Sequence, residues 1–159
     1  MKTHLFLLLS VITGLLFPQN VNDPAGFAGT SIQPPSIVMT TFSKSYQNVK
    51  ALWTLNDDNT FYATFYDETS NMGRIIIYDI NGNLVAVENE LHNNGYPVAI
   101  AAYYIKNYPK EKFVVWSYYD TNDHKTYFVN REPETVWFDR DGKFTQTVKR
   151  KNQLITRKS

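Results

Sequence analysis

The sequence contains no cysteine, and this absence excludes two kinds of chemistry. No disulfide can stabilise the fold, and no thiol can serve as a nucleophile or a metal ligand. Histidine is scarce as well, because His4 lies in an apolar N-terminal stretch and leaves only His92 and His124. With no paired-histidine motif and no cysteine cluster, we expect neither a metal site nor a cofactor.

Signatures of common enzyme classes are also missing. There is no G-x-S-x-G for a serine hydrolase and no glycine-rich loop that could hold a phosphate. Carboxylates are plentiful, so a pair about 5 to 10 Å apart could in principle hydrolyse a glycoside. Most of these acids fall in predicted turns, where Asp and Asn accept backbone hydrogen bonds, so we interpret them as structural.

Charged residues are absent from the run Leu5–Phe17, which follows Lys2 and contains thirteen mostly apolar residues. That length is typical of a signal peptide and is shorter than the roughly 20 residues of a membrane-spanning helix. An uncleaved anchor is the alternative interpretation. We predict an exported protein, periplasmic or secreted, with no stable membrane insertion after signal cleavage.

Neither charge sign dominates the predicted mature domain. Residues 30–148 carry ten Lys and Arg against fourteen Asp and Glu, a net charge of −4, whereas residues 149–159 add five positive charges. We interpret this tail as a solvated C-terminus, with a polyanion-binding segment as the alternative. No nucleic-acid partner is expected.

Two stretches of the chain resemble each other. "P-S-I-V-M-T-T-F-S-K-S-Y" from Pro35 and "P-V-A-I-A-A-Y-Y-I-K-N-Y" from Pro97 both place apolar residues at helical spacing after a proline, which the first turn of a helix tolerates. Each stretch is followed by several runs rich in aromatic and β-branched residues, which indicate strands separated by Asn- and Asp-rich turns. The first of these runs is centred on Trp53 after one stretch and on Trp116 after the other.

The third and fourth strands of each stretch are joined by matching motifs, "Y-D-I-N-G-N-L" and "F-D-R-D-G-K-F". Their Asx-Gly pairs imitate the start of a calcium-binding EF-hand loop, but the twelfth position counted from Asp139 is Arg150, where a bidentate Glu is needed. We therefore predict hairpin turns in which Gly82 and Gly142 adopt a positive φ.

These patterns predict an α+β fold of two tandem repeats, each a helix packed on its own four-stranded antiparallel meander sheet. The predicted organisation is a signal peptide at 1–20, a linker at 21–34, repeat 1 at 35–90, repeat 2 at 91–148 and a basic tail at 149–159.

The ensemble of motifs resembles the PepSY-like family of exported bacterial proteins related to β-lactamase inhibitor protein. The resemblance covers residues 35 to about 148 and includes "V-K-A-L-W", "I-I-I-Y-D-I-N-G-N-L-V" and "V-W-F-D-R-D-G-K-F"; the chain departs from the pattern at "S-Y-Q" and at Pro133. The resemblance implies two helix-plus-sheet repeats side by side with a concave surface, which binds another protein in the inhibitor relative.

Aromatic residues are abundant, with 11 Tyr, 10 Phe and 3 Trp. Because a helix covers one face of a sheet, the other face would display side chains of the type that dominates binding hot spots. We predict a non-enzymatic binding module that presents a concave aromatic surface to a protein or peptide ligand in the envelope. Inhibition of that ligand is one role that this interpretation includes. Alternatives are an envelope hydrolase that uses a carboxylate pair and a structural or adhesive component. The predicted binding residues are Trp53, Asp57, Asp58, Trp116, Tyr118 and His124.

Overall fold

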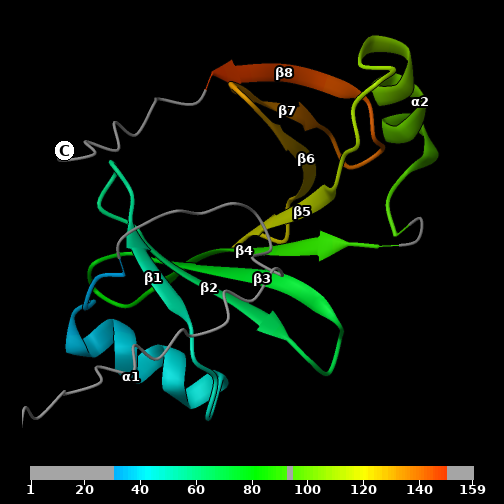
Figure 1. Ribbon diagram of the computed structural model, residues 1–159. Coiled ribbons are helices and arrows are strands. Elements are labelled where there is room, and N and C mark those ends of the chain that lie inside the picture. The colour runs from blue at the N-terminus through cyan, green and yellow to red at the C-terminus, as the bar shows by residue number, and fades with distance from the viewer. Residues whose placement is uncertain (1–30, 93–94, 150–159) are drawn as a thin grey trace, which may run out of the picture.

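The computed structural model describes residues 31–92 and 95–149. Within these described residues, the elements in chain order are α1 Ser36–Ser45, β1 Leu52–Leu55, β2 Phe61–Asp67, β3 Met72–Tyr78, β4 Leu84–Leu91, α2 Val98–Asn107, β5 Val115–Asp120, β6 Lys125–Arg131, β7 Glu134–Phe138 and β8 Phe144–Lys149. The strands form one eight-stranded antiparallel sheet in the order β1 to β8. Figure 1 shows this sheet curling, with α1 and α2 both on its outer side.

The two helices start and stop in the same way. Each begins directly after a proline, Pro35 or Pro97, whose missing N–H would have no partner in the first turn. Each ends where a tyrosine N–H donates to a carbonyl four residues back, from Tyr46 to Phe42 at 2.9 Å and from Tyr108 to Tyr104 at 2.7 Å. The predicted helices are therefore confirmed.

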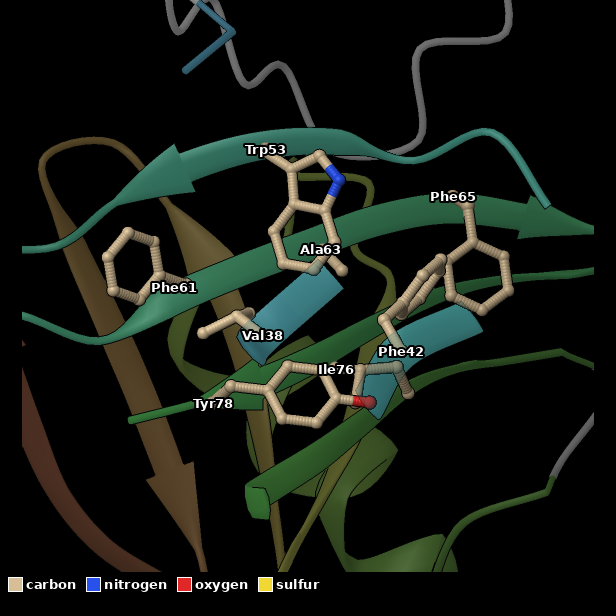
Figure 2. Packing of buried hydrophobic residues seen from close by; sticks show 8 residues of the cluster. All are labelled: Val38, Phe42, Trp53, Phe61, Ala63, Phe65, Ile76 and Tyr78. Carbon is tan, nitrogen blue, oxygen red and sulfur yellow. The ribbon is translucent and has the colours of Figure 1, made fainter. Parts of the chain in front are cut away.

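Helix α1 covers the β1–β3 part of the sheet with residues spaced one helical turn apart. Phe42 contacts Trp53 and Phe65 edge-to-face, with ring centroids 5.2 Å and 5.8 Å apart. Figure 2 shows this cluster, in which the buried side chains are Val38, Phe42, Trp53, Phe61, Ala63, Phe65, Ile76 and Tyr78. Helix α2 covers the β5–β7 part through a second cluster: Ile100, Tyr104, Val115, Tyr127, Val129, Val136 and Phe138.

The β3–β4 and β7–β8 turns have the same backbone geometry. Gly82 and Gly142 have φ values of +80° and +81°, and each glycine N–H donates to the carbonyl of an Asp three residues earlier. The carboxylate of Asp79 accepts the N–H groups of Asn81 and Asn83, both at 2.8 Å. These contacts confirm the prediction that the repeated heptapeptides are hairpin turns.

The prediction of two repeats, each a helix on its own four-stranded sheet, is wrong. β4 pairs with β5 over six residues, from Ala86 opposite Asp120 to Leu91 opposite Val115, so the strands make a single sheet. The physical reason is that two separate sheets would leave rows of unpaired N–H and C=O groups on both of these strands. The pairing satisfies these groups.

Several predictions concern residues that the structure does not describe. The signal peptide at 1–20, most of the linker at 21–34 and all but the first residue of the tail at 149–159 lie outside the described ranges. In residues 31–92 and 95–149, neither helix is long and apolar enough to cross a membrane.

Candidate functional site

The side of the sheet away from both helices carries a third apolar cluster, which we call the inner face. It lies opposite the helix-covered side because side chains alternate along each strand. Its buried members are Ile75, Ile77, Ala86, Trp116 and Phe128, and the side chains packed against them are Tyr62, Val85, Tyr118 and Trp137.

Four of these side chains form a chain of aromatic contacts across β5, β6 and β7. Trp116 stacks on its cross-strand partner Phe128 with ring centroids 6.2 Å apart, and Phe128 lies 4.9 Å from Trp137. Tyr118 meets Trp137 edge-to-face at 5.9 Å. Each aromatic pair of this kind contributes about 0.5 to 1.5 kcal/mol beyond area burial. We call Trp116, Tyr118, Phe128 and Trp137 together the aromatic wall.

A carboxyl group lies beside the aromatic wall, at the middle of the sheet. Glu88 of β4 is flanked across the strands by Ile75 of β3 and Tyr118 of β5, both members of the inner-face cluster. Its residue is 9% exposed, and burial raises the pKa of its carboxyl from 4.5 to about 8. No hydrogen bond joins its side chain to any residue of the described ranges.

Two tyrosines lie within electrostatic reach of Glu88. Burial first and the Glu88 charge second raise the pKa of Tyr62 to about 12, and the same two causes raise the pKa of Tyr118. The other charged side chains that act on these tyrosines are Asp58 and Asp120, so every charged group in this set is acidic. The local field therefore favours a cation over an anion.

The structure brings some of the predicted binding residues together. Trp116 and Tyr118 lie on the inner face, and Asp58, in the β1–β2 turn, acts electrostatically on Tyr118. His124 lies in the β5–β6 turn with its side chain 77% exposed, and its Nδ1 is 3.1 Å from Asp120 Oδ2. Asp57 is exposed in the same turn as Asp58.

Trp53 does not join this group. It is 5% exposed and lies on the outer side of the sheet, beneath α1. Alternation explains the difference, because Trp53 pairs with Ala63 of the helix-covered cluster, whereas Trp116 pairs with Glu90 and Phe128. The two tryptophans of the similar stretches thus face opposite sides.

Sequence reasoning missed Glu88. The stretch "A-V-E-N-E" from Ala86 resembles a half-exposed strand whose acids face water. The burial of Glu88 depends on Ile75 and Tyr118, which lie 13 and 30 residues away in the chain. The sequence places Ala86 and Glu88 on one face of this strand and Val87 on the other, which indicates two partly apolar faces. This pattern is the sequence feature that could have indicated the burial of Glu88.

A metal centre does not emerge from the described part of the chain. Across residues 31–92 and 95–149, no three His, Asp or Glu side chains are grouped to hold a metal ion. The carboxylates of Asp79 and Asp120 accept hydrogen bonds from their own turns.

The fold is similar to those of solved bacterial structures. A DUF2874 family protein from Bacteroides ovatus has a TM-score of 0.58 and 15% identity over 75% of this chain and 89% of its own. A protein from Bacteroides eggerthii, described provisionally as periplasmic, has a TM-score of 0.59 and 12% identity over 74% and 90%. A BLIP-like protein from Bacteroides fragilis has a TM-score of 0.49 and 17% identity over 74% and 87%. No family model and no curated protein matches the sequence.

Proposed function

We propose that this protein is an exported, non-enzymatic binding module whose inner face binds a protein or peptide partner. The observation that carries the proposal is the aromatic wall on the side of the sheet that neither described helix covers. The predicted signal peptide and the provisional periplasmic description of the structural neighbour from Bacteroides eggerthii support export.

The wall has the chemistry of a binding hot spot. Tyr and Trp bury a large area with few rotatable bonds, so they lose little conformational entropy on binding. Tyr118 and Trp137 are half-buried, which leaves part of each side chain accessible, while they contact each other and Trp137 also contacts Phe128. The partner surface would fill the curl of the sheet and contact the β1–β2 and β5–β6 turns, where Asp57, Asp58 and His124 lie.

Site-specific crosslinking tests this proposal. A photo-crosslinking amino acid replaces Tyr118 in the full chain or, as a control, replaces Ile105, a 63% exposed apolar residue of α2. In envelope extract, we expect one discrete protein adduct from position 118 and none from position 105. The partner identified in this way should bind purified wild-type chain and should lose about tenfold or more in affinity with Trp137→Ala. Equal adducts from both positions, or unchanged affinity, would contradict the proposal.

One observation favours the hydrolase alternative. The raised pKa of Glu88 suits a general acid near neutral pH, and Glu90 follows on the same face of β4. This alternative predicts turnover of a glycan or peptide library that Glu88→Gln abolishes. The alternative is contradicted if the wild-type protein turns over no compound of the library. It is also contradicted if Glu88→Gln still turns over a compound that the wild type does.

A further inference from the structure

Glu88 differs from the other acidic residues of the inner side because nothing holds its carboxyl group. Glu90, two residues later, accepts the N–H of Gly73 at 3.0 Å, and Asp120 accepts the N–H groups of Asn122 and His124. Glu88 has no hydrogen-bond partner in the described ranges, although its residue is only 9% exposed. Its oxygens are not among the fully enclosed side-chain atoms that lack a partner in the described ranges, so the carboxyl keeps a narrow opening to solvent. Burying most of a carboxyl without a hydrogen bond still costs folding free energy, and a functional role would explain that cost.

The surroundings of Glu88 favour a ligand of positive charge. Tyr118 of β5 lies directly across from Glu88. Tyr62 lies two strands from Glu88, on β2 opposite Ile77, and interacts with the carboxyl electrostatically. The acidic side chains of Asp58 and Asp120 add negative potential. Aromatic faces attract cations through the negative potential above the ring. Carboxylate and aromatic rings together would bind an organic cation and repel an anion.

The restricted exposure of Glu88 also selects the shape of the cation. An ammonium at the end of a four-carbon stem can pass between aromatic rings and bury its methylene groups against them. A guanidinium is planar and wider, and it needs a carboxylate edge open to two parallel hydrogen bonds. A side chain with 9% exposure offers little of that edge.

We propose that Glu88, with Tyr62 and Tyr118, forms a binding site on the inner face for a lysine side chain presented by a protein or peptide partner. This inference rests on the proposed function and names the group that the inner face recognises. Trp137, which meets Tyr118 edge-to-face, would hold that tyrosine in place and contact the residues beside the lysine.

Binding has a consequence for protons. Burial keeps the Glu88 carboxyl protonated below about pH 8, so an arriving ammonium displaces that proton to solvent and leaves a carboxylate–ammonium pair. With a pKa of about 8, the ionised fraction of Glu88 rises about tenfold between pH 7 and pH 9, whereas a free lysine ammonium stays largely protonated. Affinity should therefore rise about tenfold over the same interval.

Other titratable groups near the site could also contribute to a pH profile. On β4, Glu90 Oε1 lies 3.7 Å from His92 Nε2, and at the end of β5 the carboxylate of Asp120 contacts His124. Tyr62 and Tyr118 ionise well above pH 9, because burial raises the pKa of each. The Glu88→Gln variant retains all of these groups. The pH dependence of its affinity therefore measures their contribution without that of Glu88.

The test uses the full chain and the blocked peptide acetyl-Gly-Gly-Lys-Gly-Gly-amide, with norleucine, arginine and free butylamine as matched probes. Indole N–H signals in ¹H–¹⁵N spectra distinguish Trp116 and Trp137 from Trp53 on the outer side. We expect saturable shifts of the first two with the lysine peptide, an affinity about tenfold higher at pH 9 than at pH 7, and at least tenfold weaker, pH-independent binding in Glu88→Gln. Glu68→Gln, in the exposed β2–β3 turn, is the control and should behave as wild type.

Several results would overturn the inference. Equal shifts with lysine and norleucine peptides, stronger binding of arginine or butylamine, or unaltered binding in Glu88→Gln each exclude a lysine site. If Glu88→Gln does not fold, carbon-13 titration of the Glu88 carboxyl in wild type decides, because the lysine peptide must lower its pKa. If position 118 crosslinks a partner while the lysine peptide gives no shifts, this inference fails and the proposed function stands. If the lysine peptide binds as expected but position 118 crosslinks no partner, the lysine site is present and the proposed function fails.

Discussion

Gly142 lies directly against Pro97, at the place where the β7–β8 turn meets the start of α2. A β-carbon added to Gly142 would stand 2.7 Å from the Pro97 β-carbon and 3.1 Å from Ile100 Cγ1. The equivalent turn at Gly82 meets α1 less closely, with Ile37 and Thr41 atoms at 3.2 Å. Each glycine therefore serves two purposes: it allows a positive φ, and it lets the turn approach the helix.

The first prediction compares these two glycines. Gly82→Ala should lower the free energy of unfolding by about 1 to 2 kcal/mol, because both the left-handed backbone and a tight but adjustable contact oppose the methyl group. Gly142→Ala should cost about 2 to 4 kcal/mol, because the clash with the rigid Pro97 ring adds to the same backbone cost. Urea denaturation measures both. Equal losses would show that φ alone matters and that the contact with Pro97 does not.

The second prediction concerns Arg131, which lies over the ring of Tyr108 at 4.2 Å. Its Nη2 and Nε donate to Glu111 at 2.7 Å and 3.0 Å, and its Nη1 donates to Glu134. Arg131→Lys cannot reproduce this fork, so it should lower the melting temperature by a few degrees. Arg74→Lys, which changes a pair with Asp67, is the matched control and should have a smaller effect.

Acid should weaken the contact between Arg131 and Glu111. Hydrogen bonding from Arg131 holds the pKa of Glu111 below its ordinary value, so the stability that this contact contributes is present above the unfolded-state pKa and is lost as pH falls through the folded-state pKa. The difference between the melting temperatures of wild type and Arg131→Lys should therefore shrink as pH falls below 4.5, the ordinary pKa of a Glu carboxyl. A constant difference down to pH 2 would contradict the assignment.

Local features of this fold could be read from the sequence. The prolines at Pro35 and Pro97 mark both helices, and the Asx-Gly pairs mark the two turns with positive φ, because these features depend on residues close together in the chain. The continuous sheet could not be read in this way. Pairing of β4 with β5 joins residues across the whole of α2, and the alternation within each strand is the same whether or not the two strands meet.

The candidate site shows the same limit. Trp116 and Tyr118 were predicted as binding residues and lie on the inner face, whereas the position of Trp53 depends on which face α1 covers. Strand alternation gives two faces but does not say which of them meets the helix. Glu88 was missed because its burial arises from β3 and β5 and not from its own neighbours in the chain.

The third prediction follows from the raised pKa of Glu88. The folded state keeps the proton up to about pH 8, whereas the unfolded chain loses it near 4.5. Its contribution to stability is therefore complete below about pH 4.5 and declines as pH rises through about 8, by about 3 to 5 kcal/mol in total. Glu88→Gln should lack this decline, so the variant should become more stable than wild type at pH 9.

Urea denaturation of both proteins at pH 5, 7 and 9 checks the third prediction. The groups whose folded-state pKa is lowered, including Asp67, Asp79 and Asp120, oppose the trend only at acid pH and are common to both proteins. The difference between the two proteins therefore isolates Glu88. A difference that does not change from pH 5 to pH 9 would show that the Glu88 carboxyl has solvent or a partner in the folded state.

The last prediction separates stability from binding with two tryptophans. Trp53→Phe should lower the free energy of unfolding by about 1 to 3 kcal/mol, because the smaller ring leaves a cavity beside Phe42 under α1. It should leave binding at the inner face unchanged, because Trp53 lies on the other side of the sheet. Trp137→Ala should weaken binding about tenfold or more, because it removes part of the aromatic wall.

Trp137 is half-buried and contacts Phe128 and Tyr118, so its truncation also costs some stability. The decisive quantity is thus the ratio of the two effects, measured by urea denaturation and by titration with the crosslinked partner on the same samples. Trp53→Phe should change stability without changing affinity, and Trp137→Ala should change affinity by more than its loss of folded protein explains. If Trp53→Phe weakens binding as much as Trp137→Ala, the partner contacts the helix-covered side, and the assignment of the inner face is wrong.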